Sequence, residues 1–245
     1  MPSEDLRLPV RAPAEVVSGW SWIGAHRGEI LRLAVQHVEL TAVAVAVGLV
    51  VSFPLAVAAY RYRRLYGPVS WVAGLLYTIP SLALFALLVP YTGLTTTTAE
   101  VGLVICTLLV LIRNIVAGLD GVPGDVREAA LGMGYSPRQL LWRVELPLAL
   151  PVIVAGVRIA TVTTIGLVTV TALIGKGGLG ALILEGIRNY FSTPALVGAV
   201  LSVALAAAAD AVLLALQRWL TPWTRPSEVR TAVLEATPSS AVAAG

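Results

Sequence analysis

The chain has 245 residues, of which 57% are hydrophobic and 13% are charged. Soluble domains contain about 45–50% apolar and about 25% charged residues, so this composition excludes an ordinary soluble fold and favours a membrane protein with several spans. The net charge is +3, but the basic residues form no stripe with interleaved aromatic residues. No nucleic-acid partner is therefore expected.

The first 37 residues carry too many charges to cross a membrane. Residues 1–13 have no apolar core of the kind that a cleavable signal peptide needs, so membrane entry is expected from a later span. Residues 20–33 mix aromatic and aliphatic side chains with Arg27, Glu29 and Arg32, which is typical of a helix lying at the membrane interface. We therefore expect residues 1–37 to form an N-terminal interfacial segment.

Five later stretches approach or exceed the roughly 20 mainly apolar residues that a helix needs to cross a bilayer. They are residues 38–60, 69–91, 99–119, 146–174 and 195–220. Pro80 should kink the second stretch, because proline removes a backbone donor and crowds the preceding turn. The predicted fold is an all-α membrane protein with about five transmembrane helices between residues 38 and 220, so that the two chain ends lie on opposite sides.

The orientation of these spans follows from the basic residues in short loops, which stay in the cytoplasm. Arginines follow the first, third and fifth spans: Arg61, Arg63 and Arg64, then Arg127, Arg138 and Arg143, then Arg218, Arg225 and Arg230. The alternate loops, residues 91–98 and 175–194, are poor in charge. We expect an outer N-terminus and a cytoplasmic C-terminus, with residues 221–245 forming a flexible tail of Pro, Ser, Thr and Ala.

The loop between the third and fourth spans is the one long polar segment on the predicted cytoplasmic side. Asp125 could cap a short helix through Ala130, and Ser136 with Pro137 should start a second helix after a break at Gly132 and Gly134. Leu140, Leu141 and Val144 would then share one apolar face, away from Arg138 and Arg143. A short helix pair displayed in this way suits the docking of another protein.

The same loop contains a spaced set of residues: Glu128, Ala129, Ala130, Gly134, Val144, Leu146 and Pro147. This set resembles the EAA loop of ABC-importer permeases, whose signature is Glu-Ala-Ala, three residues, Gly, nine residues, Ile, one residue and Leu-Pro. Every spacing is met, and Val144 replaces the isoleucine with another β-branched residue. The likeness extends over about residues 33–220.

The resemblance implies a type I ABC importer transmembrane domain at residues 38–220. Residues 128–134 would form the centre of a coupling helix that sits in a cleft of a separate ATPase subunit. The implied partners are that ATPase, a second permease subunit, either identical or different, an extracytoplasmic solute-binding protein and membrane lipid. The chain itself would be no enzyme and would bind no cofactor or metal, because the partner subunit uses the ATP.

Three other stretches, residues 78–84, 143–153 and 172–180, look like the branch of this family that imports osmoprotectants such as glycine betaine, choline or proline betaine. Methionine-importer permeases resemble the layout too, so a methionine or other small-solute permease is the alternative. The substrate-binding residues stay unassigned. A quaternary-ammonium cage of aromatic residues is less favoured than an ordinary aromatic belt, because the tyrosines and Trp71 lie near span ends.

An ATP-independent secondary transporter or an intramembrane enzyme is the alternative from another class. A proton relay needs several intramembrane acids, whereas the spans offer chiefly Asp210, and no inverted repeat is apparent. Arg113 is expected to snorkel to the interface. Arg158 and Asp210 could be structural partners between helices or could act in gating, and Glu145 could pair with Arg143 or Arg138.

Several other features carry no chemistry. The glycines from Gly175 to Gly180 fit a dinucleotide pattern, but no strand precedes them, so a tight turn at the outer face is expected. A single cysteine, Cys106, cannot form an intrachain disulfide. His26 and His37 are too far apart for one helical face, so we expect both at the membrane interface rather than on a metal.

Overall fold

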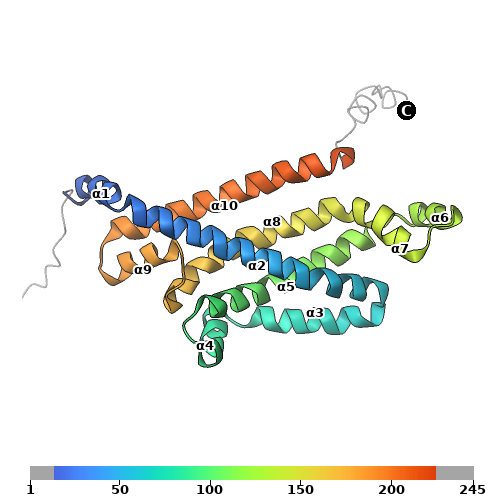
Figure 1. Ribbon diagram of the computed structural model, residues 1–245, viewed down its shortest axis with the longest axis horizontal. Helices are drawn as coiled ribbons and strands as arrows, with labels where there is room; N and C mark the ends of the chain where they lie inside the picture. The colour runs from blue at the N-terminus through green and yellow to red at the C-terminus, as the bar shows by residue number, and fades with distance from the viewer. Residues whose placement is uncertain (1–13, 225–245) are drawn as a thin grey trace, which may run out of the picture.

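The computed structural model describes residues 14–224, and within that range every regular element is helical (Figure 1). The predicted all-α fold is therefore confirmed. The α-helices are α1 Ala14–Ala25, α2 Arg27–Arg61, α3 Arg63–Thr78, α4 Ser81–Thr92, α5 Thr96–Asp120, α6 Gly124–Gly132, α7 Pro137–Leu140, α8 Leu146–Val170, α9 Gly180–Arg188 and α10 Ser192–Leu220. A π-helical turn, Leu141–Glu145, and 3-10 turns at Thr171–Ile174 and Pro222–Thr224 complete the set. The tail expected at residues 221–245 lies outside the described residues beyond Thr224.

The five predicted spans correspond to helices of the structure. Four helical stretches within the described chain are long and apolar enough to cross a membrane: α2, α5, the continuous run Pro137–Ile174, and α10. The fifth consists of α3 and α4 together, which are bent by 94°. The predicted kink at Pro80 is present, but it is a complete break of the helix rather than a bend within it.

This break follows from the chemistry of Ile79 and Pro80. Both residues have extended backbone angles, with ψ of 123° and 130°. The pyrrolidine ring disfavours helical geometry at the residue before it and supplies no N–H of its own. As a result α4 turns away from α3 and lies across one end of the bundle (Figure 1).

Helix α2 is longer than its expected span. Its 35 residues extend over about 52 Å, against roughly 30 Å of hydrocarbon. It runs without interruption through residue 38, so the last part of the expected interfacial segment and the first span share one helix. The only break in this region is at His26, whose ring stacks on Trp22 with 4.3 Å between centroids.

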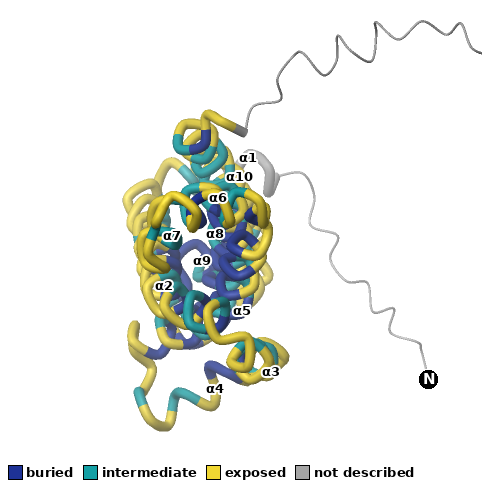
Figure 2. The backbone as a smooth tube through the Cα atoms, turned by 90° about the vertical axis from the view of Figure 1, so that its right-hand side faces the viewer, coloured by how far each residue is buried: buried dark blue, intermediate teal, exposed yellow. Residues whose placement is uncertain are grey.

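Helices α2, α5 and α8 form the centre of the bundle, where the buried residues concentrate (Figure 2). Glycines allow these helices to approach closely. A Cβ atom at Gly48 would overlap Thr107, one at Gly118 would lie 3.0 Å from the carbonyl of Ala149, and one at Gly102 would overlap the buried ring of Phe85. Small residues serve the same purpose in membrane helix packing generally.

Helix α10 is peripheral by contrast. It packs mainly on α8 and α9, and only 6% of its most apolar 18-residue window is buried. Because an apolar helix surface of this kind is compatible with lipid tails or another membrane helix, most of α10 remains available for contacts outside the chain.

The predicted turn after the fourth span is confirmed, since Gly175 and Gly178 have φ of 78° and 49°. The sequence did not predict α9, which follows it and buries Leu182. The expectation that His37 lies at the interface is wrong: its side chain is fully buried, with Nε2 3.0 Å from the carbonyl of Ile165 and Nδ1 3.3 Å from the N–H of Leu179. His37 thereby links α2, α8 and this turn.

Candidate functional site: the displayed helix and its anchor

The arginine-rich connections gather at one end of the bundle. The α2–α3 turn, α6, α7 and the C-terminal end of α10 all point to that end, whereas α1, α9 and α4 lie toward the other (Figure 1). The two basic loops after the first and third spans therefore share a side of the molecule with the end of α10, which carries Arg218. The alternate connections, between α4 and α5 and between α8 and α10, share the opposite side.

Helix α6 is the outermost element of this end (Figure 1). It begins after Pro123, and Asp125 lies in its first turn rather than at the cap position predicted for it. A carboxylate there still interacts favourably with the positive end of the helix dipole. As predicted, the helix ends at its glycines: Gly134 adopts φ of 84°, and the N–H of Tyr135 donates to the carbonyl of Ala130 over 3.2 Å.

Helix α7 begins with a capping box, as Ser136 and Pro137 predicted. The Ser136 Oγ accepts from the N–H of Gln139, and the Gln139 side chain accepts from the N–H of Ser136 over 2.8 Å. The helix does not stop at residue 140 but passes through the π-helical turn into α8. Pro147 lies two residues after this turn and lacks the N–H that would bond to the carbonyl of Arg143. The proline is therefore a local cause of the irregular helix.

The residues of the EAA-like set divide between two environments. Glu128, Ala129 and Gly134 are exposed on and just after α6, whereas Ala130 is buried. The remaining members, Val144, Leu146 and Pro147, are half-buried where the π-helical turn enters α8. The set thus combines an outward face on α6 with contacts that seat the helix pair on the bundle.

Large apolar side chains are exposed around α6. Met133 is 70% exposed, and Leu131 and Trp142 are each at least half exposed. Exposed apolar groups of this size next to a charged residue such as Glu128 are typical of surfaces that contact another protein. The predicted apolar face of Leu140, Leu141 and Val144 is half-buried, and Arg138 and Arg143 are exposed.

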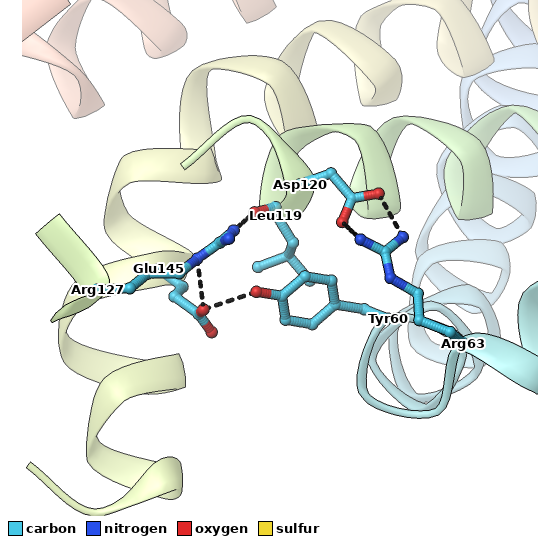
Figure 3. Close-up of polar contacts among 6 residues, drawn as sticks. All are labelled: Tyr60, Arg63, Leu119, Asp120, Arg127 and Glu145. Atoms are coloured by element: carbon cyan, nitrogen blue, oxygen red, sulfur yellow. Dashed lines mark hydrogen bonds and ion pairs between the residues drawn. The ribbon is translucent and has the colours of Figure 1, made fainter. Parts of the chain in front are cut away.

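Glu145 anchors α6 to the bundle (Figure 3). This carboxylate is 5% exposed, accepts a hydrogen bond from the Tyr60 hydroxyl over 2.6 Å and lies 3.0 Å from Arg127 Nε as an ion pair. Arg127 also donates through Nη2 to the carbonyl of Leu119 over 2.6 Å. One side chain of α6 is therefore tied to the end of α5 and to the π-helical turn.

A second ion pair lies beside the first (Figure 3). Arg63 donates to Asp120 through both Nη atoms, over 3.0 and 2.8 Å. The Tyr60 ring lies between the two guanidiniums, whose central carbons are 6.0 Å (Arg63) and 5.8 Å (Arg127) from its centroid. We call Tyr60, Glu145, Arg127, Arg63 and Asp120 the anchor cluster.

The anchor cluster corrects the expected pairing of Glu145. The sequence suggested Arg143 or Arg138, which are near in the chain, but both are exposed. The actual partners come from α2 and α6, and Tyr60 is 85 positions from Glu145. No short-range spacing could reveal them, although a glutamate beside the Leu146–Pro147 step marked the position as unusual.

Arg158 and Asp210 form a structural pair between α8 and α10. Arg158 donates to both carboxylate oxygens over 2.9 Å each and to the Gln217 side chain over 3.2 Å. The sequence left open whether these two residues pair between helices or act in gating. In the structure the two side chains are paired. Arg113 is exposed on α5 and makes no ion pair with any described residue.

The apolar helices and the helix pair displayed at one end define a polytopic membrane protein with a surface suited to a protein partner. Residues 44–225 match the family described as the binding-protein-dependent transport system inner membrane component. Because this match covers more than half of the chain, the protein belongs to that family. It is a membrane permease.

Two curated relatives illustrate the similarity. The osmoprotectant import permease protein OsmW of Salmonella typhimurium is 40% identical over 200 residues, covering 80% of this chain and 93% of OsmW. The choline transport system permease protein OpuBB of Bacillus subtilis is 36% identical over 195 residues, covering 80% of this chain and 90% of OpuBB. Among solved structures, an inward-facing conformation of the MetNI methionine ABC transporter superposes with a TM-score of 0.70 at 25% identity, covering 78% of this chain and 96% of that one.

Proposed function

We propose that this permease serves an ATP-driven importer of osmoprotectants such as glycine betaine, choline or proline betaine. The observation that carries the proposal is the 40% identity to an osmoprotectant import permease over 93% of that protein. A methionine or other small-solute cargo is the alternative, suggested by the MetNI likeness, but that likeness rests on 25% identity. The sequence similarity therefore favours osmoprotectants.

The working assembly would contain two permease subunits, two copies of an ATPase subunit and an extracytoplasmic solute-binding protein. In this assembly α6 docks into the ATPase, with Glu128, Ala129 and Gly134 at the contact and the exposed Leu131 and Met133 beside them. ATP hydrolysis belongs to the partner, and the permease binds no cofactor. The α6 end would face the cytoplasm, so that the N-terminus lies outside.

The anchor cluster gives this docking a mechanical consequence. When the ATPase pair closes and α6 moves, Arg127 moves with it and displaces its two attachment points, Glu145 and the carbonyl of Leu119. These points belong to the π-helical turn before α8 and to α5. Coupling between two sites requires contacts that differ between two conformational states. Helix α6 with its anchor cluster contacts both the ATPase and the spans, so a change at either one can shift its position.

The test is uptake into proteoliposomes by the permease reconstituted with its ATPase and solute-binding protein. Internal ATP should drive accumulation of radiolabelled glycine betaine or choline, and methionine should not compete. ATP-dependent uptake of radiolabelled methionine with no uptake of quaternary ammonium compounds would establish the alternative cargo. Uptake that continues without ATP would instead indicate a secondary transporter and remove the proposed partnership.

A further inference from the structure

A second site lies on the inner side of the helix pair. A cavity of about 540 Å³ opens between the end of α2, the α2–α3 turn and α7. Four arginines line it, Arg61, Arg63, Arg127 and Arg138, together with the single acidic side chain of Glu145. The cavity is therefore strongly basic, and it lies where the helices of the bundle leave their apolar segments.

Two of these arginines are not neutralised. Arg63 is paired with Asp120, and Arg127 is paired with Glu145. Arg61 and Arg138 are exposed and have no carboxylate partner within residues 14–224. They come from α2 and α7, so the cavity lining carries a surplus of two positive charges.

Part of the cavity lining is apolar. Val57, Leu140 and Leu141 belong to it and are half-buried. Val57 lies one helical turn before Arg61 on α2, so the apolar and basic parts follow each other along the helix axis. A soluble phosphate makes no favourable contact with apolar lining residues. A phospholipid carries a phosphate directly above its glycerol and acyl chains, so it can contact both the basic and the apolar residues. The combination fits a lipid that enters from the bilayer.

We propose that this cavity binds the phosphate group of an anionic phospholipid, with Arg61 and Arg138 as the donors. The planar guanidinium offers paired N–H groups that match phosphate oxygens, and the two surplus charges favour an anionic headgroup over a zwitterionic one. A bound lipid would join the α2–α3 turn to α7. The proposal rests on the proposed function only for placing this end at the cytoplasmic leaflet, and binding itself is independent of any cargo.

The test uses the full-length permease purified with its partner subunits in nanodiscs of phosphatidylcholine, with and without phosphatidylglycerol. Native mass spectrometry counts the lipids that remain on the released protein. The variant is Arg61→Gln combined with Arg138→Gln, and the matched control is Arg64→Gln, because Arg64 is exposed at the start of α3 but does not line the cavity. All three substituted side chains are exposed, so none should affect folding.

Wild type and the Arg64→Gln control should retain phosphatidylglycerol in preference to phosphatidylcholine. The double variant should retain it about thirtyfold less, because each basic residue near an anionic surface contributes roughly a fivefold gain in binding. The lipid should also raise the Tm of wild type but not of the double variant. Equal retention by the double variant and the control would overturn the proposal.

A further arm separates the two possible sources of phosphate. Glycerol 1-phosphate is added to the same complex in detergent, and its effect on the Tm is compared with that of phosphatidylglycerol. If the soluble phosphate stabilises the protein as much as the lipid does, the cavity serves a soluble anion and the lipid assignment is wrong. A protein that fails to import any osmoprotectant but shows selective lipid retention would refute the proposed function and leave this site standing.

Discussion

Glu145 shows how a single buried carboxylate can hold a displayed helix in place. It is buried at 5% exposure and its two partners come from helices other than its own. Removing one member of a buried pair leaves the other charge without compensation, which is costly in proteins. The pair beside it, Arg63 and Asp120, has the better geometry but is exposed, and exposed pairs contribute little.

We predict that Glu145→Gln destabilises the permease more than Asp120→Asn does. The first change should cost about 2 kcal/mol, below the roughly 3–5 kcal/mol of fully buried pairs because Arg127 keeps some solvent contact. The second should cost less than about 1 kcal/mol. Thermal unfolding of the detergent-purified protein measures both, and equal losses would show that the burial of Glu145 is unimportant.

A double-mutant cycle tests whether Tyr60 and Glu145 act together. Tyr60→Phe and Glu145→Gln, separately and combined, should give a coupling free energy of about 1 kcal/mol, because residues that share a hydrogen bond are non-additive. Tyr60→Phe with Asp210→Asn is the control pair, since Asp210 pairs with Arg158 and no described hydrogen bond joins it to the anchor cluster. Additive losses in the first cycle would contradict the anchor.

At the scale of elements, α6 depends on the glycine that ends it. Gly134 has φ of 84°, where residues other than glycine are strained, whereas Gly132 is not in that region and has open space around it. Gly134→Trp should therefore abolish ATPase docking while leaving membrane insertion intact, and Gly132→Ala should retain docking. Copurification of the ATPase measures docking, and normal transport by Gly134→Trp would remove the assignment of α6 as the coupling helix.

Packing between α4 and α5 depends on Gly102. A Cβ atom there would overlap Phe85, so Gly102→Ala should lower stability by about 1–3 kcal/mol, in the range of overpacked cores. Gly166→Ala in α8 is the control, because nothing lies within 4 Å of the added atom. Thermal unfolding distinguishes the two, and an unaffected Gly102→Ala variant would mean that α4 is loosely packed.

The elements that the sequence predicted well are those with local causes. Pro80 breaks a helix by its own chemistry, Ser136 and Gln139 lie at the spacing of a capping box, and Gly134 and Gly175 permit turns. Apolar length alone located the spans. Each of these signals lies within a few residues of the feature that it causes. It can therefore be recognised in the sequence without knowledge of the three-dimensional structure.

The contacts that the sequence could not predict join distant parts of the chain. His37 is 128 positions from the carbonyl it contacts, and Arg158 is 52 positions from Asp210. Helix α9 was missed because its nine residues are too few to cross a membrane and follow a glycine-rich turn, so the search for spans treated them as part of a connection. The composition of the EAA-like set indicated where α6 would be, but only the folded chain shows which side chains hold it.

For the molecule as a whole, the orientation can be measured directly. Met133 and Tyr190 are 70% and 91% exposed, and they lie in the predicted cytoplasmic and outer connections respectively. In a Cys106→Ala background, a membrane-impermeant maleimide should label Tyr190→Cys in intact spheroplasts and Met133→Cys only after permeabilisation. The reverse pattern would show that the basic loops face outward.

The broken span between α3 and α4 imposes a requirement on the whole molecule. At the 94° bend the Thr78 hydroxyl donates to the carbonyl of Leu75 over 2.7 Å and the N–H of Ile79 donates to the carbonyl of Leu76 over 3.4 Å. The carbonyls that follow in α3 and the first N–H groups of α4 lose their helical partners, and both Thr78 and Pro80 are exposed there. Lipid tails offer no hydrogen bonds, so irregular backbone at membrane depth must meet protein or water. A single copy surrounded by hydrocarbon would leave these groups unsatisfied; wherever the break sits at membrane depth, a neighbouring chain or a hydrated passage has to adjoin it.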